Sequence, residues 1–183
     1  MISKRAIREV TPISPSFVSN IFIVPKKDEN LKPLNSQFLS PPHFKMDSVK
    51  DVASLLQPGD FRASIDLKDA YFHLPIHPSQ RNYLRLIWRG KLYEFLVLPF
   101  GLCTAPFVFT KLTRPLAAFL RLRGIQAMFY LDNILILRRS HQECLRFVQL
   151  ALKTLQQAGF LITWKKSCLT LSQRFLFLGL WWD

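Results

Sequence analysis

Two aspartates stand where two β-prone segments end, and their setting indicates metal-dependent chemistry. Asp132 lies in Tyr-Leu-Asp-Asn at 130–133, where two apolar runs joined by the polar Asp-Asn pair predict a hairpin with an acidic tip at 132–133. Asp66 lies in Ser-Ile-Asp-Leu at 64–67, at the end of another predicted strand. If the two strands are sheet neighbours, both carboxylates meet at one edge, where they can bind Mg²⁺ and the phosphates of a nucleotide. Taken singly, either aspartate is equally typical of a turn at a strand end.

The charge of the chain favours a polyanionic partner. The 183 residues include 25 Lys and Arg against 12 Asp and Glu, a net charge of +13. The basic residues are spread along the sequence, which suits a charged groove on a folded body better than a basic arm. The alternative is a protein that is basic without such a partner. An apolar content of 49% is enough for a core, in one domain or in one large and one small lobe.

Cysteine usage and hydropathy exclude several other classes. Cys103, Cys144 and Cys168 are far apart and form no Cys-x-x-Cys pair, so neither a disulfide framework nor a zinc site is predicted. The longest uncharged run, 95–110, is too short and too interrupted by Pro and Gly to cross a bilayer, so no membrane partner is expected. We expect an intracellular protein of the cytoplasm or nucleus.

The elements that must position the aspartates follow an α+β pattern. Residues up to 59 are proline-rich and predict extended chain with one strand and one short helix. The expected strands are 20–24, 61–67, 81–88, 92–98, 127–129, 134–137, 160–164 and 175–180, and the expected helices are 48–56, 104–122 and 140–158. This order favours an antiparallel sheet with helices packed on one face.

The helix at 140–158 has the clearest pattern. Ser140 is a natural N-cap and Glu143 completes a capping box. Four apolar residues at helical spacing predict its buried face; they are Leu145, Val148, Leu152 and Leu155.

Several motifs in sequence order resemble one enzyme family. They are Ser-Ile-Asp-Leu-Lys-Asp-Ala-Tyr-Phe at 64–72, Leu-Pro-Phe-Gly-Leu at 98–102, Tyr-Leu-Asp-Asn at 130–133, Gly-Phe at 159–160 with Lys-Lys at 165–166, and Phe-Leu-Gly at 177–179. On these motifs the chain resembles the fingers and palm of a reverse transcriptase, an RNA-directed DNA polymerase, from a retrotransposon. The DIRS-like group is favoured over the gypsy-like group.

The resemblance implies a right-hand polymerase fold and two-metal nucleotidyl transfer from a dNTP to a primer 3′-hydroxyl. Asp66 and Asp132 would be the metal ligands, with the Leu67 carbonyl as a further candidate. Two Mg²⁺ ions are expected, with Mn²⁺ as a substitute. The expected partners are a primer on an RNA or DNA template and the dNTP.

The same resemblance assigns a nucleotide site. Tyr71 would lie under the incoming sugar and exclude a ribose 2′-hydroxyl, although a core aromatic is the plain alternative. Asp69 and Ala70 would place backbone N–H groups near the triphosphate. Phe100 and Gly101 would let the backbone approach the nucleotide and template closely, since Gly101 has no side chain.

Two lysine pairs complete the expected site. Lys166, or else Lys165, would donate a proton to the pyrophosphate, and a solvated lysine beside a strand is the alternative. Lys26 and Lys27 are the remaining basic residues of a shortened fingers segment, which lacks the Arg that relatives use to grip the triphosphate.

The chain departs from the family pattern at Asn133, where relatives have a second Asp. Asn keeps an oxygen ligand but supplies no charge, so we expect a rate loss of at least about 10²-fold. We expect residues 1–60 to be partial fingers and 61–183 to be palm with the rest of the fingers, ending at the primer grip. The thumb and RNase H regions that relatives carry in the same polypeptide are not expected here. The competing hypothesis is a catalytically inactive nucleic-acid-binding remnant, or a degraded relic of a retroelement.

Overall fold

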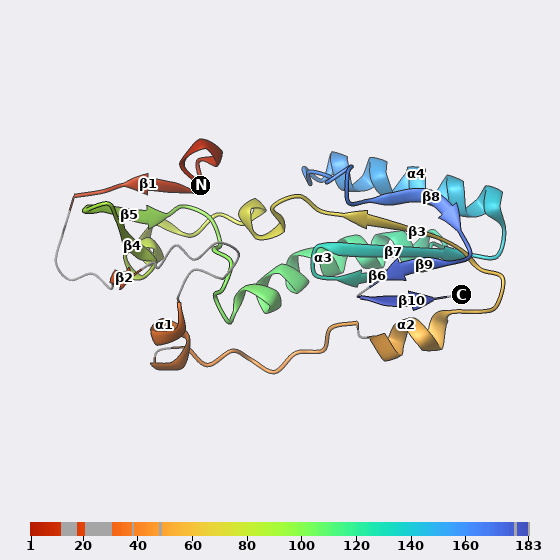
Figure 1. The fold of residues 1–183 in the computed structure, drawn as a ribbon, viewed down its shortest axis with the longest axis horizontal. Helices are drawn as coiled ribbons and strands as arrows, with labels where there is room; N and C mark the ends of the chain where they lie inside the picture. The colour runs from red at the N-terminus through yellow and green to blue at the C-terminus, as the bar shows by residue number, and fades with distance from the viewer. Residues whose placement is uncertain (12–17, 21–30, 38, 48, 178, 183) are drawn as a thin grey trace. The chain divides into compact units, whose positions relative to one another are not determined.

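The computed structural model describes residues 1–11, 18–20, 31–37, 39–47, 49–177 and 179–182. The chain divides into two units, each built from two stretches of sequence (Figure 1). Met1–His43 and Tyr71–Phe109 form the first unit, and Phe44–Ala70 and Thr110–Asp183 form the second.

The second unit contains a four-stranded antiparallel sheet in the order β6-β7-β3-β8. Its strands are β6 (Ala127–Tyr130), β7 (Asn133–Arg138), β3 (Phe61–Asp66) and β8 (Cys168–Ser172). The residues Ile-Leu-Ile-Leu at 134–137 of β7 are all buried, so both faces of the central strands are covered. The predicted antiparallel sheet of an α+β fold is confirmed.

Helix α4 (His141–Gln157) contacts β3, β7 and β8. It begins where the sequence predicts, because the Glu143 N–H donates to the Ser140 hydroxyl at 3.4 Å. Its buried side chains are Cys144, Phe147, Val148, Ala151 and Leu155. Of the expected face, Val148 and Leu155 are confirmed as buried, whereas Leu152 is half-buried and Leu145 is 41% exposed.

A second group of residues packs on the same sheet. Val52 of α2 (Val49–Leu55) clusters with Met128 of β6 and with Leu135 and Leu137 of β7. Phe177 of β9 (Phe175–Phe177) completes the cluster. Leu135 and Leu137 are two apart in β7, so they point to one face of the sheet, as the period of a strand requires.

The first unit contains a mixed sheet in the order β1-β5-β4-β2. Its strands are β1 (Ile7–Glu9), β5 (Lys91–Phe95), β4 (Arg85–Trp88) and β2 (Val18–Asn20), and β2 pairs with β4 in parallel. The predicted hairpin about Arg89–Gly90 is confirmed, since both residues have positive φ, 51° and 74°. Short helices accompany this sheet: η1 (Ile2–Lys4), α1 (Lys32–Gln37), η2 (Ala70–His73, from the last residue of the second unit) and η3 (Pro78–Tyr83). Helix α3 (Ala105–Leu122) contributes residues to both units.

The C-terminal part differs from the sequence prediction. Residues 160–164 form no strand; Ile162 makes an isolated bridge to Leu67, and the chain then turns. The strand lies later, at β8, because the carbonyl of Thr163 accepts backbone N–H groups from Lys166 and Ser167 and closes a turn. The expected strand at 175–180 is instead an antiparallel pair of short strands, β9 and β10 (Leu180–Trp182). Of the strand expected at 20–24, only residue 20 is described, at the end of β2.

Candidate active site

The register of β3 and β7 brings the two predicted carboxylate positions to one end of the sheet. Asp66 is the last residue of β3 and pairs with Asn133, the first residue of β7. Asp132 directly precedes Asn133, and its carbonyl accepts the Leu67 N–H at 2.7 Å. Asp66 and Leu67 are buried, and Asp132 is half-buried.

The β6–β7 turn differs by one residue from the expected acidic tip. Tyr130 pairs with Asn133, so Leu131 and Asp132 are the turn residues and Asn133 belongs to the strand. Leu131 has φ 51°, in the left-handed region that non-glycine residues rarely adopt. Such strain is typical of residues held in place for a purpose other than stability.

Burial is the largest influence on the pKa of the Asp132 carboxyl group in this turn. Burial raises the pKa of Asp132 above its usual value, and a backbone hydrogen bond opposes this shift. The charge of Asp66 raises the pKa further, while that of Lys166 lowers it. Two carboxylates that repel each other would each be stabilised in the charged form by a cation between them.

The carboxylates of Asp66 and Asp132 are suitable ligands for a hard divalent cation whose other ligands are water and substrate phosphates. Within the described residues, no group of three or more His, Cys, Asp or Glu could hold a metal ion. Mg²⁺ is commonly held by one or two carboxylates together with water and substrate phosphates, so it does not require a larger cluster. Asp66 and Asp132 meet that requirement, and the carbonyl of Leu67 is a neighbouring oxygen.

The lysine pair lies in a turn attached to the same strand. The Thr163 N–H donates to the carbonyl of Asp66 at 2.8 Å, and the Lys68 N–H donates to that of Leu161 at 2.7 Å. Lys165 and Lys166 are exposed, and the charge of Lys166 acts on Asp132. Sequence reasoning missed the residues that bracket this turn, Thr163 and Ser167; their only signal was a hydroxyl residue on each side of the lysine pair.

The segment that follows β3 contains the expected triphosphate residues. Asp69 has φ 51°, the second left-handed non-glycine residue near the carboxylates. Ala70 is buried and begins η2. The backbone therefore reverses sharply one to two residues beyond Leu67.

The remaining predicted nucleotide residues lie in the first unit. The Tyr71 ring is buried against Phe100 and Phe109, with centroids 4.8 Å and 5.5 Å away. Gly101 has φ 86°, and its carbonyl accepts the Asn35 side-chain amide at 2.7 Å. Tyr71, Phe100 and Gly101 are thus gathered in one unit, and Asp66, Leu67, Asp69, Ala70, Asp132, Asn133 and Lys166 in the other. Lys26 and Lys27 lie outside the described residues.

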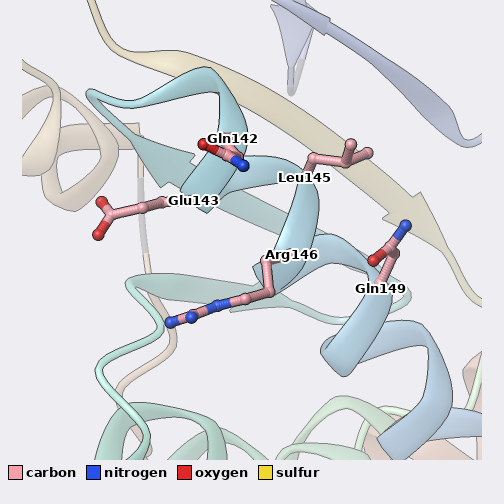
Figure 2. A pocket seen from close by; sticks show the side chains of 5 residues that line it. All are labelled: Gln142, Glu143, Leu145, Arg146 and Gln149. Atoms are coloured by element: carbon pink, nitrogen blue, oxygen red, sulfur yellow. The ribbon is translucent and has the colours of Figure 1, made fainter.

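A surface depression lies elsewhere, on α4. It has a volume of about 490 Å³ and is lined by Gln142, Glu143, Leu145, Arg146 and Gln149. Figure 2 shows that all five side chains come from this one helix. None of the predicted site residues lines it, so the carboxylate end of the sheet remains the candidate site.

No helix among the described residues is both long and apolar enough to cross a membrane.

A family model, curated relatives and solved structures all match this chain. Residues 24–182 match the family model described as reverse transcriptase (RNA-dependent DNA polymerase). The Transposon Tf2-7 and Tf2-3 polyproteins of Schizosaccharomyces pombe are each 26% identical over 152 residues, which are 80% of this chain. The same match covers 11% of each polyprotein, so the chain spans about a tenth of these relatives.

Solved structures share the fold. A foamy viral protease-reverse transcriptase in complex with double-stranded DNA matches with a TM-score of 0.82 at 22% identity, over 98% of this chain and 31% of that one. The foamy viral enzyme in complex with an RNA/DNA hybrid matches with a TM-score of 0.72 at 23% identity, over 84% of this chain and 20% of that one. With most of its residues matched by the family model, the chain belongs to the reverse transcriptase (RNA-dependent DNA polymerase) family.

Proposed function

We propose that the chain forms the fingers and palm of a retroelement reverse transcriptase and that Asp66 and Asp132 are its metal ligands. One observation carries the proposal: the β3–β7 register places Asp66 opposite Asn133, and the Leu67 N–H bonds the Asp132 carbonyl at 2.7 Å. Two carboxylates are thereby fixed at one sheet end, where the pKa of Asp132 is raised by burial and by Asp66.

The fingers would come from residues 1–60 together with 71–109, and the palm from the rest of 61–183. The boundary at residue 60 is the sequence-based one; by compact units, residues 44–60 group with the second unit and the Tyr71–Phe109 stretch groups with the first. The choice between a DIRS-like and a gypsy-like element stays a prediction.

Divalent ions, Mg²⁺ or Mn²⁺, would supply activation of a primer 3′-hydroxyl and stabilisation of the leaving pyrophosphate. The role of this chain is to hold two carboxylates in fixed positions before substrate arrives. The 2.7 Å bond from Leu67 to Asp132 and the strand pairing of Asp66 give that rigidity. Asn133 would offer a neutral oxygen where a charged one would hold a second ion more tightly.

The residues around the carboxylates would hold the nucleotide. Lys166 would place its ammonium group by the pyrophosphate, and the backbone at Asp69 and Ala70 would face the triphosphate. In the first unit, the buried Tyr71 would contact the sugar, and Phe100, 38% exposed, would sit beside it with Gly101. Lys26 and Lys27 would add positive charge for the triphosphate.

A primer on an RNA or DNA template is the proposed macromolecular partner. The net charge of +13 supports binding of a polyanion. Structural neighbours with the same fold are complexes with double-stranded DNA and with an RNA/DNA hybrid, which supports both types of duplex.

Asn133 favours a second candidate function, a nucleic-acid-binding domain without polymerase activity. The lost carboxylate lies directly beside the proposed metal ligands, where charge matters most. Such a protein would bind primer–template in a salt-dependent way and would extend nothing.

Primer extension with Mg²⁺ or Mn²⁺ separates the two functions. The chain and its Asn133→Asp variant would be compared on a homopolymer template, each alone and fused to the thumb of a reverse transcriptase. The polymerase proposal expects extension that increases on the order of 10²-fold with Asn133→Asp and vanishes with Asp66→Asn. Salt-dependent binding without extension in every form would establish the binding domain instead.

A further inference from the structure

The backbone of Asp66 is held on both sides of its α-carbon by the turn that carries the lysine pair. The Thr163 N–H donates to the Asp66 carbonyl at 2.8 Å. The Asp66 N–H donates to the hydroxyl oxygen of Ser167 at 3.0 Å. A side chain, 101 residues away in sequence, thus replaces a strand partner at this position.

The replacement occurs where β8 leaves the sheet. The pairing of β8 with β3 ends at Ser64 and Cys168, and it is irregular before that point. Past Ser64, no strand among the described residues pairs with β3 on the β8 side to accept the Asp66 N–H. Asp66 is only 8% exposed. A buried N–H without an acceptor destabilises the folded state, so the Ser167 hydroxyl stabilises it by accepting this hydrogen bond.

The same hydroxyl also closes the turn. It donates to the carbonyl of Thr163 at 3.0 Å, and this carbonyl accepts the backbone N–H groups of Lys166 and Ser167 as well, both at 3.0 Å. One side chain therefore connects the Asp66 backbone to the turn that contains Lys166, whose charge acts on Asp132.

We infer that Ser167 is a positioning residue, which fixes the Lys166 turn against the backbone of the metal-binding strand. The inference rests on the proposed function for its catalytic meaning, because it assigns Ser167 to the reaction of Asp66, Asp132 and Lys166. Its physical content, a hydroxyl that couples turn and strand, is testable without activity.

Amide hydrogen exchange measures this coupling directly. In Ser167→Ala, the Asp66 amide should exchange at least about 10-fold faster, because its acceptor is lost. The Leu67 amide, bonded to Asp132 on the other side of the strand, should change less than about 2-fold. Ser167→Thr keeps the hydroxyl and should restore the slow exchange.

Ser172, the last residue of β8, provides a matched control. Its hydroxyl bonds the backbone of Arg174, at 2.6 Å and 3.1 Å, at the far end of β8. Ser172→Ala should leave the Asp66 amide unchanged. If Ser167→Ala does not fold, Ser167→Cys offers a weaker acceptor, and exchange at Asp66 should still increase.

Steady-state kinetics of primer extension, measured in the Asn133→Asp chain, test whether Ser167 affects catalysis. Ser167→Ala should lower kcat about 10-fold while the KM for dNTP stays within about 2-fold, and Thr should restore kcat. Unchanged Asp66 exchange in Ser167→Ala or Ser167→Cys, or equal effects of Ser167→Ala and Ser172→Ala, would overturn the inference. Failure of every form to extend a primer would overturn the polymerase function alone, since the exchange result stands without it.

Discussion

The hairpins β4–β5 and β6–β7 both have two-residue turns, but the residues in these turns differ. The β4–β5 turn uses Arg89 and Gly90, both at positive φ, and Gly adopts that conformation without cost. The β6–β7 turn uses Leu131, also at φ 51°, followed by Asp132. Both turns therefore begin with a non-glycine residue at φ 51°, and they differ at the second position, which is Gly90 in one turn and the carboxylate residue Asp132 in the other.

The two hairpins also differ in the side chains that pair across their strands. In β4–β5, Arg85 is paired with Glu94 across the strands, and Arg8 also contacts Glu94 at 2.7 Å. In β6–β7, the three cross-strand pairs farthest from the turn are apolar, such as Met128 with Leu135, and the pair next to the turn is Tyr130 with Asn133. The β6–β7 hairpin thus buries apolar side chains such as Met128 and Leu135 in the core and places a carboxylate at its turn, whereas the β4–β5 hairpin contains a buried charged residue, Glu94, in its strands.

The largest effect should come from moving one charge by one residue. The double change Asp132→Asn with Asn133→Asp keeps net charge and composition, but takes the carboxylate from the turn to the strand. Extension by this chain should fall on the order of 10²-fold below the unaltered chain, because the carboxylate no longer stands at the turn position. Equal extension rates in a primer-extension assay would contradict a specific role for Asp132.

The next effect tests the ion pairs of Glu94 in the other hairpin, one with the buried Arg85 and one with the exposed Arg8 of β1. Glu94 is 3% exposed and contacts two arginines, so Glu94→Gln leaves buried cationic charge uncompensated. Urea unfolding should show a loss of about 3 kcal/mol. Glu9→Gln, which removes an exposed partner of Lys91, serves as the control and should cause no measurable loss.

A smaller pair of effects should have opposite signs in the two turns. Leu131→Gly relieves left-handed strain and should stabilise the chain by about 1 kcal/mol. Gly90→Ala should destabilise it by about 1 kcal/mol; no atom lies within 4 Å of the added Cβ, so the cost is conformational alone. Thermal unfolding measures both, and a loss of stability in Leu131→Gly would show that the turn is not strained.

The smallest effect is a pH dependence. Folding raises the pKa of Asp132, so its contribution to stability is lost as pH rises from the ordinary carboxyl value through the raised one. Asp132→Asn should therefore melt slightly higher than the unaltered chain at pH 7, by at most about 3 °C, and the difference should vanish below about pH 4. A difference that grows on acidification would contradict the burial of this carboxylate.

Local signals in the sequence predicted much of the fold. Ser140 and Glu143 located the start of α4, and Arg89–Gly90 located a turn, because caps and positive-φ positions depend on few neighbouring residues. The order of the expected strands and helices predicted the α+β class and the antiparallel sheet, and the structure confirms both.

Long-range pairing explains what the sequence could not predict. The stretch at 160–164 has strand propensity, yet Thr163 and Ser167 bond the backbone of Asp66, about a hundred residues earlier, and hold the chain in a turn. The acidic tip was misplaced by one residue because register, rather than residue type, decides which residues form a turn. The predicted buried face of α4 was right at Val148 and Leu155 but wrong at Leu145, since packing on β3, β7 and β8 buries Cys144 instead.

Mn²⁺ binding, measured by electron paramagnetic resonance on the whole chain at neutral pH, tests the central claim most directly. Asp66 and Asp132 are claimed to form one divalent-cation site, so Asp66→Asn and Asp132→Asn should each weaken Mn²⁺ binding at least about 10-fold. Glu9→Gln, which removes an exposed carboxylate of the first unit, should leave the affinity unchanged. Equal Mn²⁺ affinity in all four proteins would contradict a metal site at the Asp66–Asp132 end of the sheet.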